Sequence, residues 1–456
     1  MKLGYQYITL TLLMFHAFVN AQEQNSPIAE KPALEIPAPP LDERLYGLSL
    51  LWSETKFSFA FFDQVPDLDW DAEYQKYITR VEQTETLYQY YRELQSFMAL
   101  LSDGHTGVSM PQEIKVDIAP VWVEVIEDKY YISRTNRQLV DQVPLGSEVI
   151  SVRGMPVREY VKSEVAPYIG QSSPQARDMY QSGYLLSGIT GEKVDFTIVT
   201  PEGEQRESSV IANYFYGPDV EPVPAIPSSE MKVEWFDNKI AKVNLSTFAD
   251  KTVPDRFESL IPELVNADAI ILDLRTNGGG MTGVGSAVLS HFTDQNLAGS
   301  KWSTRKHLAA HRVWGSYGSG PNKVYADLNA WTEPEFMPEI KVSKTGQLAD
   351  KPVAVLTSTK TASAAEDFLI YADPLENMTR IGQPTFGSTG QPLSLKLPGG
   401  GYARICTKRD TWQDGTDFVG VGVEPEIYVA RSVENIISGK DTTLDVAIEY
   451  LNSKLN

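Results

Sequence analysis

Two almost uninterrupted apolar segments in the C-terminal half constrain the fold most: residues 269–274 (AIILDL) and residues 352–356 (PVAVL). Apolar runs without regular polar alternation are typical of strands that are buried on both faces. Helical patterns lie between them, one from about Asp255 to Val265 and one that ends near Leu289. Strands that alternate with helices in this way predict a parallel sheet covered by helices on both faces.

The second apolar segment leads into a polar turn and an Ala-rich helix at residues 357–366 (TSTKTASAAE), and the helix is expected to begin at Ser363. A hydroxyl at a helix start lies beside free backbone NH groups and the positive end of the helix dipole, which favours a developing oxyanion. Ser363 is therefore a candidate nucleophile. A serine in this place can also be a simple helix cap, and its position alone does not separate the two roles.

The N-terminus is typical of a secretory signal. Lys2 precedes an apolar run at residues 8–18, and Val19-Asn20-Ala21 has the small-x-small pattern that signal peptidase cuts. The run is shorter than the roughly 20 residues needed to span a bilayer. We therefore predict a signal peptide at residues 1–21, no stable membrane insertion, and a periplasmic or extracellular location. Residues 22–42, rich in Pro, Gln and Glu, are predicted to form an extended linker.

Composition argues against nucleic-acid binding and against a cysteine metal site. The formal net charge is -20, and it becomes -21 when Lys2 is removed with the signal. Such acidity, without any basic run, argues against nucleic acid as a partner. Cys406 is the only cysteine, so the chain has no disulfide framework and no cysteine metal cluster. No metal or organic cofactor is expected.

Residues 43–113 are predicted to form a helical domain, because apolar and aromatic residues recur there every three or four positions. The domain ends in LSDGHTG (residues 101–107), where glycines on both sides of His105 indicate a turn. His291 lies in a helical pattern and is expected to be structural. His307 and His311 are four residues apart and could share a helix face, as zinc ligands do, but no HExxH glutamate or cysteine accompanies them.

Residues 114–215 alternate short β patterns. The stretch GSEVISVRGMPV (residues 146–157) resembles the core of a PDZ domain, in which a sheet edge and its neighbouring helix hold an extended peptide. The other interpretation is a β-rich spacer. Further along, residues 298–350, rich in Trp, Tyr, Gly and Pro, are predicted to be a long insertion near the site.

Four motifs then follow in a characteristic order: DLRTNGGG (residues 273–280), TASAAE (residues 361–366), TFG (residues 385–387) and GVEPE (residues 422–426). Together with the turn at His105, they resemble the tail-specific (C-terminal processing) protease family, in its tricorn-like branch. The resemblance implies an α+β multidomain chain with a ClpP/crotonase-like α/β catalytic domain at residues 232–431, a spiral of ββα units. Residues 432–456 are expected to form a C-terminal helix.

The resemblance also implies roles for single residues. Ser363 matches the family nucleophile and His105 matches the general base of the tricorn-like branch. The backbone NH of Ala364 matches one oxyanion donor, and Gly278 or Gly279 matches the second. Because His105 stands 258 residues before Ser363, the helical domain must fold back over the catalytic domain.

Two positions depart from the family pattern. Ser388 stands where processing peptidases carry a catalytic lysine, which argues against a Ser-Lys dyad. Gly104 stands where tricorn protease has a serine that links the histidine to a glutamate. The group that orients His105 is therefore left open, with Asp417, Glu424 and Glu426 as candidate acids.

Several charged residues near the motifs are expected to have other roles. Glu366 and Asp273 are interpreted as structural. Lys360, Lys396 and Lys408 are the lysines nearest to the motifs, and they are interpreted as solvated charges on turns or hairpins. A histidine base with an ordinary pKa of about 6.5 predicts activity that rises through about pH 6 to 7.

The resulting hypothesis is an exported serine endopeptidase that cleaves polypeptides through an acyl-enzyme. Two alternatives stay open: an inactive relative that binds a peptide or an apolar ligand, and a hydrolase of small esters or amides on the same fold. The sequence leaves the substrate and the oligomeric state undetermined.

Overall fold

The computed structural model describes residues 35–213, 221–226, 228–318, 320–340 and 346–455. The predicted signal peptide (residues 1–21) and residues 22–34 of the predicted linker lie outside these ranges. Within the ranges, no helix is both long and apolar enough to cross a membrane.

Helices build the N-terminal region, where the three- and four-residue spacing predicts them. Asp69 begins the second helix by accepting the Ala72 NH at 3.0 Å, and Thr86 begins the third with a capping box. Their apolar faces meet in an aromatic core, in which the rings of Trp70 and Phe97 stack with centroids 4.1 Å apart. The bounds are α1 (Leu41–Ser58), α2 (Trp70–Glu82) and α3 (Leu87–Ala99).

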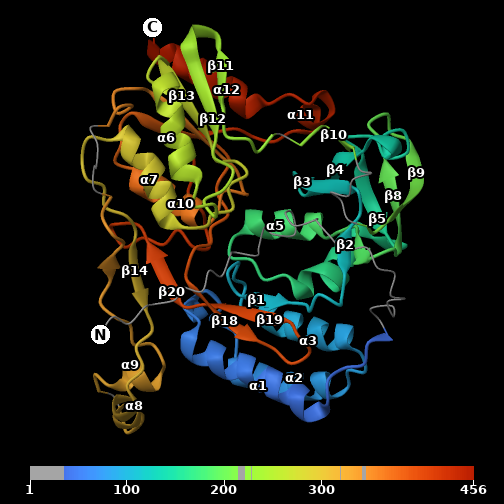
Figure 1. Cartoon of the computed structure of the whole chain (residues 1–456). Coiled ribbons are helices and arrows are strands. Elements are labelled where there is room, and N and C mark those ends of the chain that lie inside the picture. Colours follow the sequence, from blue (N-terminus) through green and yellow to red (C-terminus); the bar gives the residue numbers. More distant parts are fainter. Residues whose placement is uncertain (1–34, 214–220, 227, 319, 341–345, 456) are drawn as a thin grey trace.

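A short strand, β1 (Gly107–Ser109), joins this helical region to the C-terminal part of the chain (Figure 1). It pairs antiparallel with β19 (Tyr402–Cys406), which pairs in turn with β18 (Pro392–Lys396). Directly before β1, the Thr106 hydroxyl accepts the Cys406 NH at 2.9 Å. The turn that carries His105 is therefore fixed by residues 300 positions further along the chain.

The middle of the chain forms an antiparallel sheet with a hydrophobic core of its own. Arg153 and Gly154, with φ of 50° and 79°, turn β5 into β6 at the glycine-containing motif. Helix α5 lies against β3 and faces the C-terminal half (Figure 1). The bounds are β2 (Val116–Ile118), β3 (Val121–Ile126), β4 (Lys129–Asn136), β5 (Glu148–Val152), β6 (Met155–Pro156), α4 (Val157–Tyr160), α5 (Pro174–Gly183), β7 (Ser187–Ile189), β8 (Lys193–Val199), β9 (Gln205–Ile211) and β10 (Pro222–Val223).

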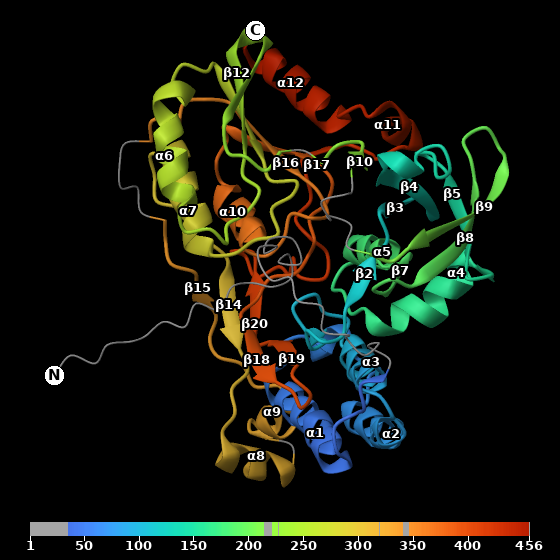
Figure 2. The same ribbon diagram turned by 45° about the vertical axis from the view of Figure 1, so that its right-hand side comes forward.

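The C-terminal half is built on a sheet with the order β11-β12-β13-β16-β17-β21, in which the strands from β12 onward are parallel. Leu272 and Val355 pack on the side of α6, α7 and α10, whereas Ile271 and Leu356 pack on the side of α12. Figure 2 shows helices on both sides of this sheet. The uninterrupted apolar runs therefore belong to strands buried on both faces, as predicted. The bounds are β11 (Val233–Phe236), β12 (Ile240–Asn244), α6 (Val253–Leu264), β13 (Ala269–Asp273), α7 (Thr282–Leu289), β16 (Val353–Thr357), α10 (Ala364–Ala372), β17 (Met378–Gly382), β21 (Ile427–Tyr428), α11 (Val433–Ser438) and α12 (Thr442–Leu455).

The segment predicted as an insertion leaves this sheet and returns to it. Its first strand, β14 (Lys301–Thr304), pairs with β20 (Lys408–Thr411) and with β15 (Glu335–Phe336). The chain between β14 and β15 forms α8 (Ala309–Ser316) and α9 (Lys323–Ala326). In both overall views α8 and α9 lie at the end of the molecule near α1, far from α10 (Figures 1 and 2). This part of the insertion is thus not near the predicted site.

Candidate active site

Ser363 stands at the junction of the buried strand β16 and helix α10. It precedes the first helical residue, Ala364, and has φ 56° and ψ -124°, a backbone conformation that is rare for a residue with a side chain. Two contacts fix this conformation: the Ser363 NH donates to the Glu366 carboxylate at 3.0 Å and to the Ser388 carbonyl at 3.2 Å. The hydroxyl is thereby presented at the N-terminal end of α10.

His105 lies beside Ser363, although 258 residues separate them in the sequence. Its Nε2 is 3.3 Å from the Ser363 hydroxyl oxygen. The turn that carries it is held by Asp103, whose carboxylate accepts the His105 NH at 3.1 Å and the Ser172 hydroxyl at 3.0 Å. The structure thus brings the predicted nucleophile and the predicted base within hydrogen-bonding reach.

Burial changes the acid–base properties of His105. Its side chain is removed from water, and Arg404 and Lys408 add positive charge nearby; together these effects lower the pKa of His105 to about 3. The imidazole is therefore neutral at physiological pH, which is the form that accepts a proton. The expectation of an ordinary imidazole pKa does not fit this buried site.

Ser388 is the residue that contacts the other nitrogen of the imidazole. Its hydroxyl oxygen is 2.6 Å from His105 Nδ1, and the serine is fully buried. A neutral imidazole that donates its Nδ1 proton to this hydroxyl keeps the lone pair of Nε2 directed at Ser363. Sequence reasoning considered Ser388 only as a substitute for a lysine and missed this contact.

The three acids expected to orient His105 lie elsewhere. Asp417 forms an ion pair with Arg409, Glu426 forms one with Arg380, and Glu424 is exposed. Within the described part of the chain, none of them is hydrogen-bonded to His105. The structure therefore corrects the expectation of an orienting carboxylate, because a hydroxyl occupies that place.

Glu366 connects the turn at Ser363 to the turn at Ser388. Its buried carboxylate accepts the backbone NH of Ser363, of Gly387 at 2.7 Å and of Ser388 at 3.2 Å, and also the Thr385 hydroxyl. Burial raises the pKa of Glu366 to about 8, against the effect of these hydrogen bonds, which favour the ionised form. The contacts agree with the structural role expected for this residue.

The glycine run after β13 passes close to Ser363. A Cβ added to Gly279 would lie 2.6 Å from the Ser363 Cβ and 2.9 Å from the Ala364 nitrogen, so only glycine fits there. The Gly279 NH donates to the Asn277 side-chain oxygen at 3.0 Å. By contrast, the NH groups of Gly278 and Ala364 donate no hydrogen bond to any residue that the structure describes. Of the two glycines considered, Gly278 is therefore the one whose NH group is left as a candidate oxyanion donor.

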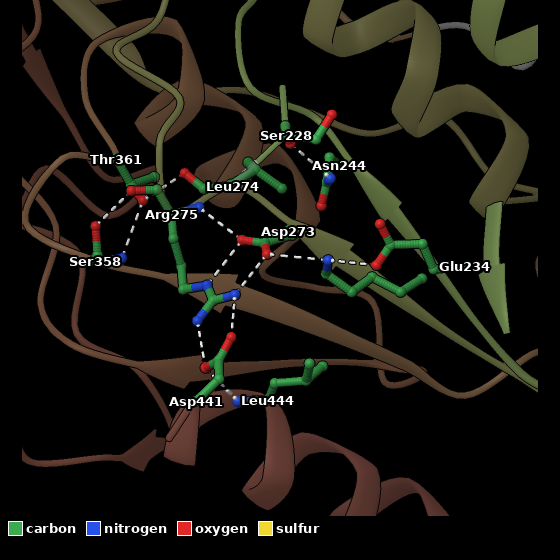
Figure 3. Close-up of polar contacts among 11 residues, drawn as sticks. Ser228, Glu234, Asn244, Asp273, Leu274, Arg275, Ser358, Thr361, Asp441 and Leu444 are labelled. Atoms are coloured by element: carbon green, nitrogen blue, oxygen red, sulfur yellow. Dashed lines mark hydrogen bonds and ion pairs between the residues drawn. The ribbon is translucent and has the colours of Figure 1, made fainter. Parts of the chain in front are cut away.

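Asp273 belongs to a network of hydrogen bonds and ion pairs at the end of β13 (Figure 3). Its carboxylate accepts two hydrogen bonds from Arg275, at 2.9 and 2.7 Å, and Arg275 also pairs with Asp441 at 2.6 Å. The Arg275 carbonyl accepts the Ser358 hydroxyl at 2.6 Å, and the Leu274 carbonyl accepts the Thr361 hydroxyl at 2.9 Å (Figure 3). This network ties the turn before Ser363 to the neighbouring strand.

Two of the three lysines are not the solvated charges that were expected. Lys360 lies with Nζ 5.0 Å from the centre of the Trp122 ring, and burial lowers its pKa. Lys408 is largely buried and pairs with Asp410 at 2.9 Å. Only Lys396 is exposed, as expected. Lys360 and Lys408 are held by tertiary contacts that a pattern of turn residues does not reveal.

Helix α5 closes the site from the side of the middle sheet. The Gln175 side chain donates to the Thr385 carbonyl at 2.9 Å, and Ala176 packs with Ala362 and Phe386. In this arrangement Ser363 is only 7% exposed and His105 5%. The hydroxyl and the imidazole are thus largely shielded from water by the residues around them.

Comparison with known sequences gives a family match over the C-terminal half. Residues 239–429 match Peptidase family S41. Carboxy-terminal processing protease CtpA of Bacillus subtilis is 24% identical over 205 residues, which are 44% of this chain and 37% of that protein. The match thus spans little more than a third of the length of this curated relative.

Comparison with solved structures extends the likeness to most of the chain. Mature CPAF in complex with lactacystin has 17% identity and a TM-score of 0.69, over 91% of this chain and 98% of that chain. A structure from Parabacteroides merdae has 18% identity and a TM-score of 0.53, over 90% of this chain and 96% of that chain. At these identities the likeness concerns the fold alone.

Proposed function

We propose that this chain, in which residues 239–429 match peptidase family S41, is a tail-specific serine endopeptidase with Ser363 as nucleophile and His105 as general base. The observation that carries the proposal is the 3.3 Å approach of His105 Nε2 to the Ser363 hydroxyl at the start of α10. Two further observations support the proposal: the imidazole is neutral, and the NH groups of Gly278 and Ala364 donate no hydrogen bond within the described residues.

The reaction follows from these positions. His105 Nε2 accepts the Ser363 proton while the hydroxyl oxygen attacks the peptide carbonyl carbon. The resulting oxyanion accepts hydrogen bonds from the NH groups of Ala364 and Gly278. The imidazolium then donates its proton to the leaving amine, which leaves an ester on Ser363. Water attacks this ester with His105 again as base, and the acid product and the free serine are released.

A fluorophosphonate probe and a peptide library test this function. The probe should label the purified protein, and the library should show cleavage of internal peptide bonds. An absence of labelling would favour a binding protein without activity, and labelling without peptide cleavage would favour a hydrolase of small esters or amides.

Ser388 is proposed to be a positioning residue that fixes the imidazole tautomer. Ser388→Ala removes the partner of Nδ1, so kcat should fall by roughly 10- to 100-fold, less than on loss of the base itself, with little change in KM. Ser388→Thr keeps a hydroxyl and should restore part of the activity. Ser394→Ala, at an exposed position of β18, is the control, and equal activity of all three variants would contradict the role of Ser388.

The middle sheet is proposed to be a PDZ-like module that receives polypeptide. Within the described residues β3 pairs with β4 alone, and α5 lies beside β3, so an extended chain can add to the free edge of β3 next to this helix. Because α5 also contacts residues 385 and 386, binding there would act on the walls of the site. Long polypeptides should then have a lower KM than short esters, and equal KM values would argue for a spacer.

Export is proposed from the N-terminal sequence. The charge, the apolar run and the cleavage pattern of residues 1–21 predict that the exported protein begins at Gln22. The intact mass of protein recovered from the cell envelope or medium should match a chain that starts there. A mass that includes residues 1–21 would contradict cleavage.

A further inference from the structure

The helical hairpin of the insertion, described at residues 306–318 and 320–326, exposes large apolar side chains; we name it the α8–α9 hairpin. Trp314 is 54% exposed and Tyr317 is 79% exposed. Three further apolar residues are exposed on the same hairpin: Leu308, Val313 and Val324. Single exposed apolar residues are common on proteins, but five on so short a segment mark an interaction surface.

The hairpin has an inner face that explains its fold and an outer face without a partner in the described chain. The His311 ring lies 5.0 Å from the rings of both Trp314 and Tyr325, so Trp314 is covered on one side by His311 and is still 54% exposed. The His307 ring contacts the Phe57 carbonyl at the end of α1. Tyr317, by contrast, directs its side chain to solvent. Figure 1 shows the hairpin protruding from the end of the molecule.

The charge of this segment is opposite to that of the protein. Residues 301–327 contain five Lys and Arg residues and one acidic residue, Asp327, a net charge of +4 in a chain of -20. Lys323 pairs with Asp327 at 2.7 Å. Lys306 and Arg312 are exposed, and within the described residues neither forms an ion pair. The exposed apolar residues thus lie on the same segment as two exposed cations outside ion pairs, of which Arg312 also lies over the Phe57 ring at 5.4 Å.

We propose that the α8–α9 hairpin docks the protein onto a membrane surface that contains anionic phospholipids. Trp and Tyr side chains favour the boundary between headgroups and acyl chains, and Lys and Arg beside them attract anionic headgroups. Helix α8, with eight residues, is too short to cross a bilayer, so the contact is peripheral and reversible.

A second copy of the chain fits this surface less well. A symmetric contact through the same patch would place Lys306 and Arg312 of one copy near those of the other, and like charges repel. An acidic protein partner would satisfy the cations and would also cover Trp314 and Tyr317, since aromatic residues are common in protein interfaces; the vesicle experiment distinguishes it from a lipid surface. A lipid surface satisfies both the cations and the aromatic side chains.

Sedimentation with vesicles tests the proposal on the full mature chain. The protein should bind vesicles of phosphatidylcholine mixed with phosphatidylglycerol, and binding should weaken with salt because the attraction is screened. The double change Trp314→Ser with Tyr317→Ser should lower the partition coefficient about tenfold or more. Lys306→Gln with Arg312→Gln should lower it several-fold, and only for the anionic vesicles.

Trp235→Ser is the matched control, because Trp235 is 44% exposed on β11, away from the hairpin; it should bind vesicles like the unchanged protein. Circular dichroism should show that all variants fold. Failure of the unchanged protein to bind anionic vesicles would overturn the proposal. An equal loss of vesicle binding in the Trp235→Ser control would also overturn it. The same holds if light scattering shows a dimer that the Trp314 and Tyr317 changes abolish while vesicle binding stays unchanged.

Discussion

Replacement of Ser363 by alanine should abolish fluorophosphonate labelling and lower peptide cleavage by roughly 10⁴- to 10⁶-fold. The change removes the only atom that can form the acyl ester, and no other hydroxyl lies at the start of α10 beside His105 Nε2 in the described structure. The backbone contacts of residue 363 with Glu366 and Ser388 involve its NH group. The variant should therefore fold, with an almost unchanged melting temperature.

A second serine provides the control for this experiment. Ser259 is exposed on α6, and its hydroxyl donates only to a carbonyl of its own helix, that of Arg256. Ser259→Ala should label and cleave like the unchanged protein. Continued labelling of the Ser363→Ala protein, at a site identified by peptide mapping, would exclude Ser363 as the nucleophile.

Replacement of His105 by alanine should lower turnover by roughly 100-fold or more, the lower range for loss of a general base. The pH profile provides a second test. Because burial lowers the pKa of His105 to about 3, the imidazole stays neutral as pH falls, and kcat/KM should change little between about pH 5 and 8. An ordinary imidazole would instead give a rise through about pH 6 to 7.

The same pKa shift acts on stability. The unfolded chain binds a proton at His105 below about pH 6.5, whereas the folded protein does so only near pH 3. Protons are therefore taken up at His105 on unfolding in this window, and the contribution of His105 to the free energy of unfolding should fall as pH falls from about 6.5 toward 3, whereas the contribution of Glu366, whose pKa is raised to about 8, should rise as pH falls toward about 4.5. The acid limit of activity should accordingly coincide with loss of structure in circular dichroism.

Lysine variants separate the two classes of base. Lys396→Met changes an exposed side chain and should leave activity unchanged. Lys360→Met and Lys408→Met should leave the base intact, although loss of Lys408 leaves the buried Asp410 without its ion pair and should lower stability. Near-normal turnover of His105→Ala, together with an inactive but folded lysine variant, would contradict the histidine assignment.

Local patterns predicted the parts of the fold that depend on local chemistry. The apolar runs of β13 and β16 were interpreted as strands buried on both faces, and the strand, turn and helix around Ser363 have that order in the structure. The turn at His105 was also identified from its glycines. The approach of His105 to Ser363 was expected only through family resemblance, and the pairing of β1 with β19 that accompanies it was not predicted, because no local pattern encodes such a contact.

The other features of the candidate site depend on contacts between residues that are far apart in the sequence, and local patterns do not reveal such contacts. The hydroxyl of Ser388 reaches His105 across 283 positions, so neither residue type nor spacing identifies the pair. The sequence did allow a partial prediction that Gly278 rather than Gly279 has the unbonded NH group. Asn277 stands two residues before Gly279, and Asn side chains often accept a hydrogen bond from a nearby backbone NH. The burial of Lys360 by Trp122 depends on how the middle sheet packs on the C-terminal half.

The ladder between β1 and β19 also sets the time at which a new chain can become active. During synthesis the ribosome releases His105 early and Ser363 much later, and the contacts of the turn at His105 with residues 402–406 can form only after those residues have been made. Contacts of such high sequence separation form late in folding. A nascent or truncated chain that ends before β19 would therefore carry both residues without this strand ladder, and the proposed proteolytic activity is expected only after nearly the whole polypeptide has been made.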